Sequence, residues 1–154
     1  EKKNKGIWEN DIVEIGYKYQ MTDIAASMGI SGLDSFVDQL QHRRSLFNRY
    51  RNRIKNISDV HFIDNEDKKY FHSAWLCTVL VENRIDLQNK LMNHKIESSQ
   101  VHYRNDKYSI FSKYNIGTLV NMDEIEQNYL VLPLHSKVTL DDVDFICDVI
   151  EKGW

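Results

Sequence analysis

The chain has 154 residues, of which 42% are hydrophobic and 28% are charged, and its formal net charge is -3. This composition predicts one folded domain with a hydrophobic core and excludes a disordered chain. The small negative charge, and the lack of any apolar stretch near the roughly 20 residues of a membrane span, argue against nucleic acid and membranes as partners.

The first residues and the two cysteines bear on the origin and compartment of the chain. Residues 1–6 are polar and lack a methionine, which indicates a piece of a longer protein. Cys77 and Cys147 are too few for a disulfide framework and form no C-x-x-C motif, so both are predicted to be buried structural thiols. Free thiols fit a reducing compartment, and we expect a cytoplasmic protein.

The N-terminal third predicts two helices. Thr22 or Asp23 can cap the first helix, which is expected to end near Gly29. The second is expected to begin near Ser31, because its apolar residues recur at spacings of three, four and seven, as in a long amphipathic helix. These apolar positions are Leu33, Phe36, Val37, Leu40, Phe47, Tyr50 and Ile54.

The opposite face of this long helix is strongly basic over residues 43–55 (RRSLFNRYRNRIK). One interpretation is a nucleic-acid face. The other is a solvated side on which arginine stems cover apolar surface. The net charge and the absence of a known nucleic-acid motif favour the solvated side.

The middle of the chain predicts short strands that alternate with helices. β-branched and aromatic residues gather in the expected strands, and apolar residues return to helical spacing in the expected helices. Pro133 should stop the last strand. The expected strands are residues 60–63, 75–81, 96–103 and 130–134, and the expected helices are residues 86–94 and 122–129.

A last helix is predicted from Thr139, which can form a capping box with Asp142. Its buried stripe would contain Val143, Ile146, Cys147 and Ile150. The order of elements along the chain predicts an α+β domain, with a small sheet and helices packed on it.

Few residues point to chemistry on local evidence. The six histidines show no compact metal-ligand spacing, and no phosphate-binding glycine loop occurs. The stretch SSQVHYR, residues 98–104, is the best candidate, because His102, Tyr103 and Arg104 would lie together at the end of a strand. The alternative is a packed tyrosine beside a histidine whose hydrogen bonds are satisfied within the protein.

Three stretches, in this order, resemble the C-terminal part of the DegT/StrS family of sugar aminotransferases. The first is GYKYQMTDIAASMGISGLDSF with the following RR and Tyr50, similar to the family's G-Y-N-Y-R-M-[ST]-D-I-x-A-A-x-G, long helix and R-R. The second is QVHYR, similar to G-V-H-Y-P. The third is YLVLPLHSKVTLDDVDFICDVI, similar to L-x-L-P-L-H-P-x-L-x-x-x-D-V-x-x-V. Together they extend over residues 12–150.

The resemblance implies the small C-terminal domain of a pyridoxal phosphate (PLP) enzyme of the aspartate-aminotransferase fold, fold type I. Residues 1–30 would form an interface strap and a small-residue helix, and residues 31–154 the small domain with an antiparallel-type sheet and a long amphipathic helix. The intact enzyme would be a homodimer. It would transfer an amino group, with glutamate as the expected donor, to a nucleotide-linked keto-deoxy sugar for polysaccharide or antibiotic sugar biosynthesis.

The resemblance also implies roles for particular residues. Lys18 and Gln20 would reach the phosphate of the PLP held by the neighbouring subunit, and His102 and Tyr103 would contact the sugar substrate. In the family pattern the first pair is asparagine and arginine, and a lysine donates to phosphate only as a point charge on a flexible stem. Arg104 stands where the family has a proline.

The family's Schiff-base lysine lies in a serine/lysine segment followed by T-T-G-E-G-G, which does not occur in this sequence. We therefore assign no catalytic residue to the chain, and expect that by itself it neither holds PLP tightly nor transaminates. The histidine spacings likewise lead us to assign no metal site. The alternative is a non-catalytic dimerisation, interaction or regulatory module of the same fold. As part of the enzyme, residues 7–30 should expose apolar surface that the large domain and the partner subunit normally cover.

Overall fold

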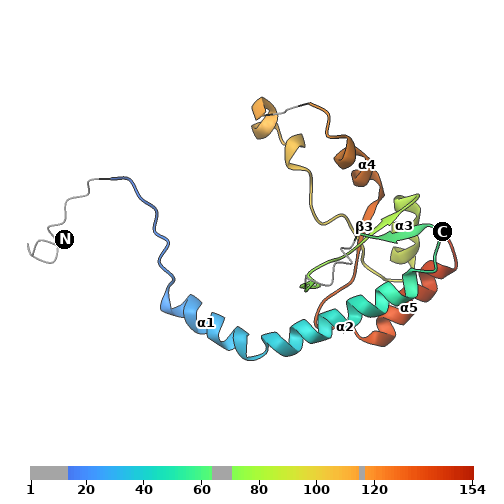
Figure 1. Ribbon diagram of the computed structural model, residues 1–154, viewed down its shortest axis with the longest axis horizontal. Helices are drawn as coiled ribbons and strands as arrows, with labels where there is room; N and C mark the ends of the chain where they lie inside the picture. Colours follow the sequence, from blue (N-terminus) through green and yellow to red (C-terminus); the bar gives the residue numbers. More distant parts are fainter. Residues whose placement is uncertain (1–13, 64–70, 115–116) are drawn as a thin grey trace, which may run out of the picture. The chain divides into compact units, whose positions relative to one another are not determined.

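The computed structural model describes residues 14–63, 71–114 and 117–154 (Figure 1). The chain divides into two compact units, of which the first ends at Ser35 and the second is Phe36–Trp154. In the described part of the chain, no helix is long and apolar enough to cross a membrane.

The first unit contains helix α1 (Asp23–Asp34). The backbone N–H of Ala25 donates a 3.2 Å hydrogen bond to the Thr22 hydroxyl, which confirms Thr22 as the N-cap. The expected end near Gly29 is wrong, because the helix continues to Asp34. A glycine ends a helix when it adopts a left-handed conformation, and Gly29 is not among the residues with positive φ.

Helix α2 (Phe36–Ile54) opens the second unit. The predicted apolar stripe is buried only in the C-terminal half of the helix. Phe36 and Val37, near its start, remain 54% and 59% exposed. The long helix expected from Ser31 begins five residues later, at Phe36. Its buried residues are Leu46, Phe47, Tyr50 and Ile54.

Three antiparallel strands form one sheet in the order β1-β2-β3, namely β1 (Val60–Phe62), β2 (Cys77–Val81) and β3 (Tyr129–Leu132). Cys77 lies opposite Leu132 in the register. Every second residue of β2 is buried, as expected for a sheet with one face on the core. The strand predicted over residues 75–81 is confirmed with a later start.

One face of the sheet packs with α2, α3 (Arg84–Asn93) and α5 (Leu140–Glu151) around a single core. Helix α4 (Val120–Asn128) lies on the other side of the sheet (Figure 1). The helices predicted over residues 86–94 and 122–129 correspond to α3 and α4. The α+β class is confirmed.

The strand predicted over residues 96–103 is wrong. Only Ser99 pairs with β3, through an isolated bridge in which the N–H of Val131 donates to the Ser99 carbonyl at 3.0 Å. Beyond Ser99, this segment is held by side-chain hydrogen bonds instead of backbone pairing. The Gln100 amide donates to the Glu126 carbonyl, and the Tyr129 hydroxyl donates to the His102 carbonyl. The chain then forms two 3-10 turns that the sequence did not predict, η1 (Asn105–Lys107) and η2 (Ser109–Tyr114).

Helix α5 begins as predicted. The Thr139 hydroxyl accepts from the N–H of Asp142 at 3.1 Å, and the Asp142 carboxylate accepts from the N–H of Thr139 at 2.8 Å, which completes the capping box. Cys77 and Cys147 are both fully buried free thiols, as predicted. Burial raises the pKa of each thiol, that of Cys147 to about 12.

Candidate functional site

The loop after the Ser99 bridge places His102 and Tyr103 on a pocket of about 460 Å³. Both side chains are exposed at the pocket, although they lie in a loop and not at a strand end. The opposite walls come from β2, α4 and the start of β3. The pocket is lined on these sides by Leu76, Thr78, Met122, Ile125 and Tyr129.

His102 is held by its backbone and by one aromatic neighbour. The Tyr129 hydroxyl donates a 2.6 Å hydrogen bond to the His102 carbonyl. The imidazole lies 5.8 Å from the Trp75 ring, tilted by 50°. Neither ring nitrogen has a hydrogen-bond partner within the described residues, so both can donate to or accept from a ligand.

Tyr103 is the second polar group at this pocket. Its ring packs edge-on against Tyr108, with 5.0 Å between centroids and 66° between planes. Edge-to-face packing of this kind fixes a ring without using its hydroxyl. A phenol and an imidazole from adjacent residues therefore present two adaptable hydrogen-bonding groups at one opening.

Arg104 follows this pair and also lines the pocket, but its side chain has a different environment. It is the one buried charged residue in the described part of the chain, with a side chain 6% exposed. Its guanidinium donates to both oxygens of Asp106, at 3.0 and 2.6 Å, and to carboxylate oxygens of Asp123 and Glu126. The bond from Arg104 keeps the pKa of Asp106 below its usual value.

Lys18 and Gln20 lie in the first unit, in a stretch without helix or strand that leads into α1. Both are exposed. The neighbouring Tyr17 and Tyr19 rings pack on each other at 5.5 Å, with 38° between their planes. The structure thus places each predicted pair within one unit: Lys18 with Gln20 in the first, and His102 with Tyr103 in the second.

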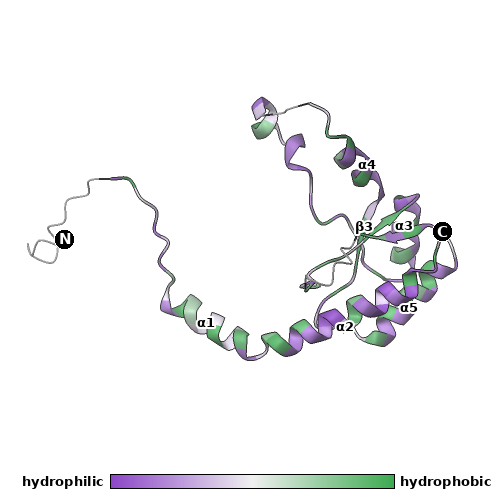
Figure 2. Cartoon of the chain, in the orientation of Figure 1, coloured by the Kyte–Doolittle hydropathy of each residue, from purple (hydrophilic) through white to green (hydrophobic). Residues whose placement is uncertain are grey.

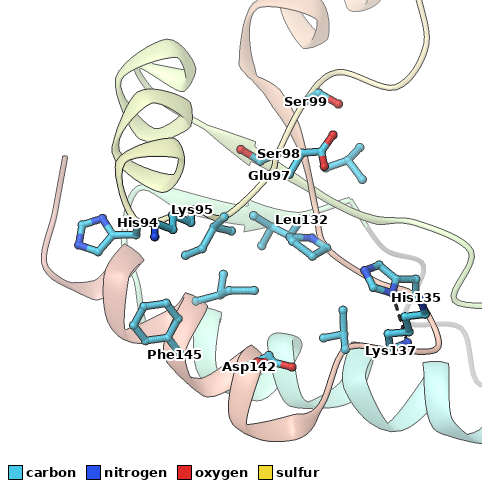
Figure 3. A pocket seen from close by; sticks show the side chains of 15 residues that line it. His94, Lys95, Glu97, Ser98, Ser99, Leu132, His135, Lys137, Asp142 and Phe145 are labelled. Carbon is cyan, nitrogen blue, oxygen red and sulfur yellow. Dashed lines mark hydrogen bonds between the residues drawn. The ribbon is translucent and has the colours of Figure 1, made fainter.

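A second pocket, of about 550 Å³, was not predicted from the sequence (Figure 3). Figure 3 shows His94 and Lys95 at one end of it and His135 and Lys137 at the other. Ile96, Leu132, Val138 and Ile146, which belong to the buried core, line it between these ends.

The histidines of this pocket are oriented by backbone contacts. The Nδ1 atom of His135 accepts from the N–H of Lys137 at 3.2 Å, and the Nδ1 atom of His94 lies 2.9 Å from the Lys90 carbonyl. No group of three potential metal ligands occurs within residues 14–63, 71–114 and 117–154. The sequence held no signal for this pocket, because its walls come from segments some 40 residues apart.

A sequence model of the DegT/DnrJ/EryC1/StrS aminotransferase family matches residues 1–151. The chain belongs to this family. The match extends over all three stretches that carry the sequence resemblance, which is thereby confirmed.

Individual members of the family agree with this assignment. The chain is similar to GDP-perosamine synthase of Escherichia coli O157:H7, with 28% identity over 142 residues, which cover 90% of the chain and 38% of the relative. Among solved structures it is similar to the sugar aminotransferase CalS13 from Micromonospora echinospora, with a TM-score of 0.86 and 24% identity over 94% of the chain and 38% of CalS13. Spr1654 from Streptococcus pneumoniae, solved in its PLP-form, gives a TM-score of 0.81 and 27% identity over 96% of the chain and 39% of that protein.

The chain thus spans about two fifths of the length of the curated relatives that it matches. Its three-stranded antiparallel sheet with packed helices has the fold of the small domain of fold-type-I sugar aminotransferases. The predicted fold class is therefore confirmed at the level of the family.

For a DegT/DnrJ/EryC1/StrS aminotransferase, the QVHYR stretch predicts His102 and Tyr103 as substrate-contacting residues, but nothing in the sequence indicated the environment of Arg104. Its partners Asp123 and Glu126 are 19 and 22 residues away, on α4. No local pattern links an arginine in a loop with acidic residues on a later helix. Only the folded chain reveals the cluster.

Proposed function

We propose that the chain is the small-domain region of a PLP-dependent aminotransferase that transfers an amino group to a keto-deoxy sugar carried on a nucleotide. An amino acid, with glutamate as the expected donor, would supply the amino group. The family match over residues 1–151 carries the proposal. The names GDP-perosamine synthase and sugar aminotransferase, borne by relatives, support a sugar nucleotide as the acceptor, and we propose polysaccharide or antibiotic sugars as the product class.

In this proposal His102 and Tyr103 contact the sugar. Sugar hydroxyls both donate and accept hydrogen bonds, and an imidazole beside a phenol can accept the first kind and donate the second. The apolar walls of the pocket, including Leu76 and Ile125, would exclude water around those bonds and so strengthen them. Their role is to orient the sugar, and the amino transfer itself depends on groups outside the chain.

The side chains of Lys18 and Gln20 carry chemical groups that can bind the phosphate of PLP. An exposed ammonium and an amide N–H₂ two residues apart supply a cation and neutral donors, which is what a phosphate requires. When bound, PLP supplies the electron sink for amino transfer. The serine/lysine segment of the family is absent from the sequence, so we propose that the 154-residue chain alone neither retains PLP nor transaminates.

The test compares the 154-residue chain with the full-length gene product. The full-length protein should show the visible absorbance of protein-bound PLP and form an amino sugar from a nucleotide-linked keto sugar and glutamate. The chain alone should do neither. Stable PLP absorbance in the 154-residue chain would contradict the inactivity proposal, and a full-length protein without PLP or transfer would contradict the aminotransferase proposal.

Lys18 has its own test in the full-length protein. Replacing Lys18 with alanine should increase the loss of PLP during dialysis, because one cation facing the phosphate is removed. Lys55→Ala is the matched control, since Lys55 is exposed at the end of α2 and has no proposed cofactor role. Equal PLP retention in the two variants would exclude Lys18 from the phosphate site.

The first unit favours pairing with a second copy of the protein. No residue of α1 is buried, and Figure 2 shows apolar residues along this helix. Single exposed apolar residues are ordinary, but many of them within one segment favour an interaction surface. This set, together with the preceding stretch, contains Ile15, Tyr17, Tyr19, Met21, Ile24, Met28, Ile30 and Leu33. Residues 7–13 of the apolar stretch predicted from sequence lie outside the described residues.

We propose a homodimer held in part by this surface. The same observation supports the alternative function, a dimerisation or regulatory module without catalysis. Light scattering on the full-length protein should show a dimer that dissociates more readily when Met28 and Leu33 are replaced by serine. A dimer that binds no PLP would favour the module, whereas a monomer would contradict the role of this surface in both functions.

A further inference from the structure

We propose that Arg104 is a positioning residue, which holds His102 and Tyr103 at the 460 Å³ pocket by fastening their loop to α4. It does not itself bind the substrate. The inference rests on the proposed function, in which His102 and Tyr103 contact the sugar.

The contacts of Arg104 reach in two directions. Its Nε and Nη2 atoms donate to Asp106, within the same loop, and so fix the turn that follows Tyr103. Its Nη1 atom donates to Asp123 and, at 3.3 Å, to Glu126, both on α4. Charged, forked hydrogen bonds of this kind hold geometry more firmly than single neutral ones.

Helix α4 is a wall of the pocket, because Met122, Ile125 and Glu126 line it. Fastening the loop to α4 therefore fixes the loop relative to the pocket. A second tie, from the Tyr129 hydroxyl to the His102 carbonyl, lies at the other end of the pair. His102 and Tyr103 are thus held between two anchors.

Arg104 has little capacity left for a ligand. Four hydrogen bonds already engage a guanidinium that has five N–H donors, and the side chain is 6% exposed. Lys107 also pairs with Glu126, at 2.5 Å. Two cations facing the carboxylates of Asp106, Asp123 and Glu126 give the cluster a net charge of one negative unit.

A negative cluster at its edge makes this pocket unsuited to a diphosphate. We therefore assign the pocket to the uncharged sugar portion of a nucleotide sugar, and place the diphosphate outside it. Removing the carboxylates distinguishes two possible roles of Arg104. An arginine that binds the substrate itself would bind it more strongly once Asp123 and Glu126 no longer engaged the guanidinium. An arginine that positions the loop would no longer hold it, and the sugar would bind more weakly.

The experiment measures KM and kcat of the full-length gene product for the sugar nucleotide and for the amino donor. Arg104→Met should raise KM for the sugar roughly tenfold, the effect of losing charged hydrogen bonds, and leave KM for the amino donor unchanged. Asp123→Asn with Glu126→Gln should also raise KM for the sugar, and adding Arg104→Met should add little further. A lower KM for the sugar in the variant lacking the two carboxylates would overturn the proposal.

Arg53→Met is the matched control. Arg53 also donates to three carboxylates, those of Asp144, Asp148 and Glu151, but it does not line the pocket. It should lower the thermal midpoint without changing KM. If Arg104→Met behaves like Arg53→Met, Arg104 is merely structural and the inference fails.

Two further variants separate a failure of this inference from a failure of the proposed function. Asp123→Asn alone, at a side chain 51% exposed, tests the tie to α4 even if Arg104→Met does not fold. It should raise KM for the sugar, and an unchanged KM would contradict the inference. His102→Ala tests the proposed function: if it leaves KM for the sugar unchanged, the assigned role of the pair fails, whatever Arg104 does.

Discussion

The hydroxyl of Tyr129 donates a 2.6 Å hydrogen bond to the backbone carbonyl of His102. Tyr129 is the first residue of β3, and its backbone is fixed by pairing with Leu80 of β2. The position of the candidate substrate-contacting histidine is therefore set by the sheet, through one side chain. The loop would otherwise be attached to β3 only at Ser99.

Replacing Tyr129 with phenylalanine removes the hydrogen bond to the His102 carbonyl and keeps the aromatic ring. We expect KM for the sugar to rise about fivefold, the equivalent of one hydrogen bond of about 1 kcal/mol, with a small change in thermal midpoint. Tyr114→Phe is the control, because its ring is 66% exposed and it does not line the pocket. Equal KM values for the two variants would show that His102 needs no tie to the sheet.

Tyr50 provides a prediction on stability that is independent of the pocket. Its side chain is fully buried on α2, and its hydroxyl donates to the Pro133 carbonyl at 3.0 Å, just beyond β3. Burial raises the pKa of this phenol, so it remains a donor at any ordinary pH. Tyr50→Phe should lower the free energy of unfolding by about 1–2 kcal/mol, because the carbonyl loses its partner.

Urea unfolding followed by circular dichroism measures this difference. Tyr114→Phe again serves as the control, and its exposed ring should give a change near zero. A Tyr50→Phe variant as stable as the unchanged protein would mean that the Pro133 carbonyl finds another donor.

The thiols predict a chemical property of the folded chain. Alkylation requires the thiolate, and burial raises the pKa of Cys147 to about 12 and that of Cys77 well above its usual value. Neither should react with iodoacetamide at pH 8 over hours, and both should react within minutes in 8 M urea, a contrast expected for fully buried thiols. Mass spectrometry of the alkylated peptides distinguishes the two sites, and fast labelling of either one in buffer would contradict its burial.

Local signals predicted the elements whose ends are set by local chemistry. The Thr22 cap and the Thr139–Asp142 capping box are bonds between residues three apart, so sequence spacing alone reveals them. The strand at residues 77–81 followed from its density of apolar and β-branched residues.

The sequence failed where distant residues decide the conformation. Gly29 does not end α1, since nothing local forces it into a left-handed conformation. Residues 96–103 have the composition of a strand, but only Ser99 pairs with β3, and the His102 carbonyl accepts from the Tyr129 hydroxyl instead of from a neighbouring strand. Local evidence made residues 98–104 the best candidate site, but only the family resemblance favoured binding over packing for His102 and Tyr103.

The capping box of α5 makes acid stability depend on one carboxylate. Two hydrogen bonds from Thr139, one from its backbone N–H and one from its hydroxyl, hold the pKa of Asp142 below its usual value. A carboxyl with a lowered pKa in the folded state stabilises the fold fully above its unfolded pKa of about 4, and this stabilisation is lost as the pH falls through the folded pKa. The free energy of unfolding should therefore decrease below about pH 4, and Asp142→Asn should make that decrease shallower.

Asp141→Asn is the matched control for this prediction. Asp141 lies in the same first turn and feels the same helix dipole, but its carboxylate makes no hydrogen bond with another described residue. Urea unfolding between pH 3 and pH 7 should then show a shallower acid slope for Asp142→Asn than for Asp141→Asn, a pattern set by the linkage of proton binding to folding. Thr139→Ala should cost about 1 kcal/mol at neutral pH, the usual value of an N-cap, and should also flatten the acid slope, because Asp142 would lose the hydroxyl bond that lowers its pKa. If the two aspartate variants had equal slopes, the hydrogen bonds of the box would not be the cause, and the helix dipole alone would account for the pH dependence.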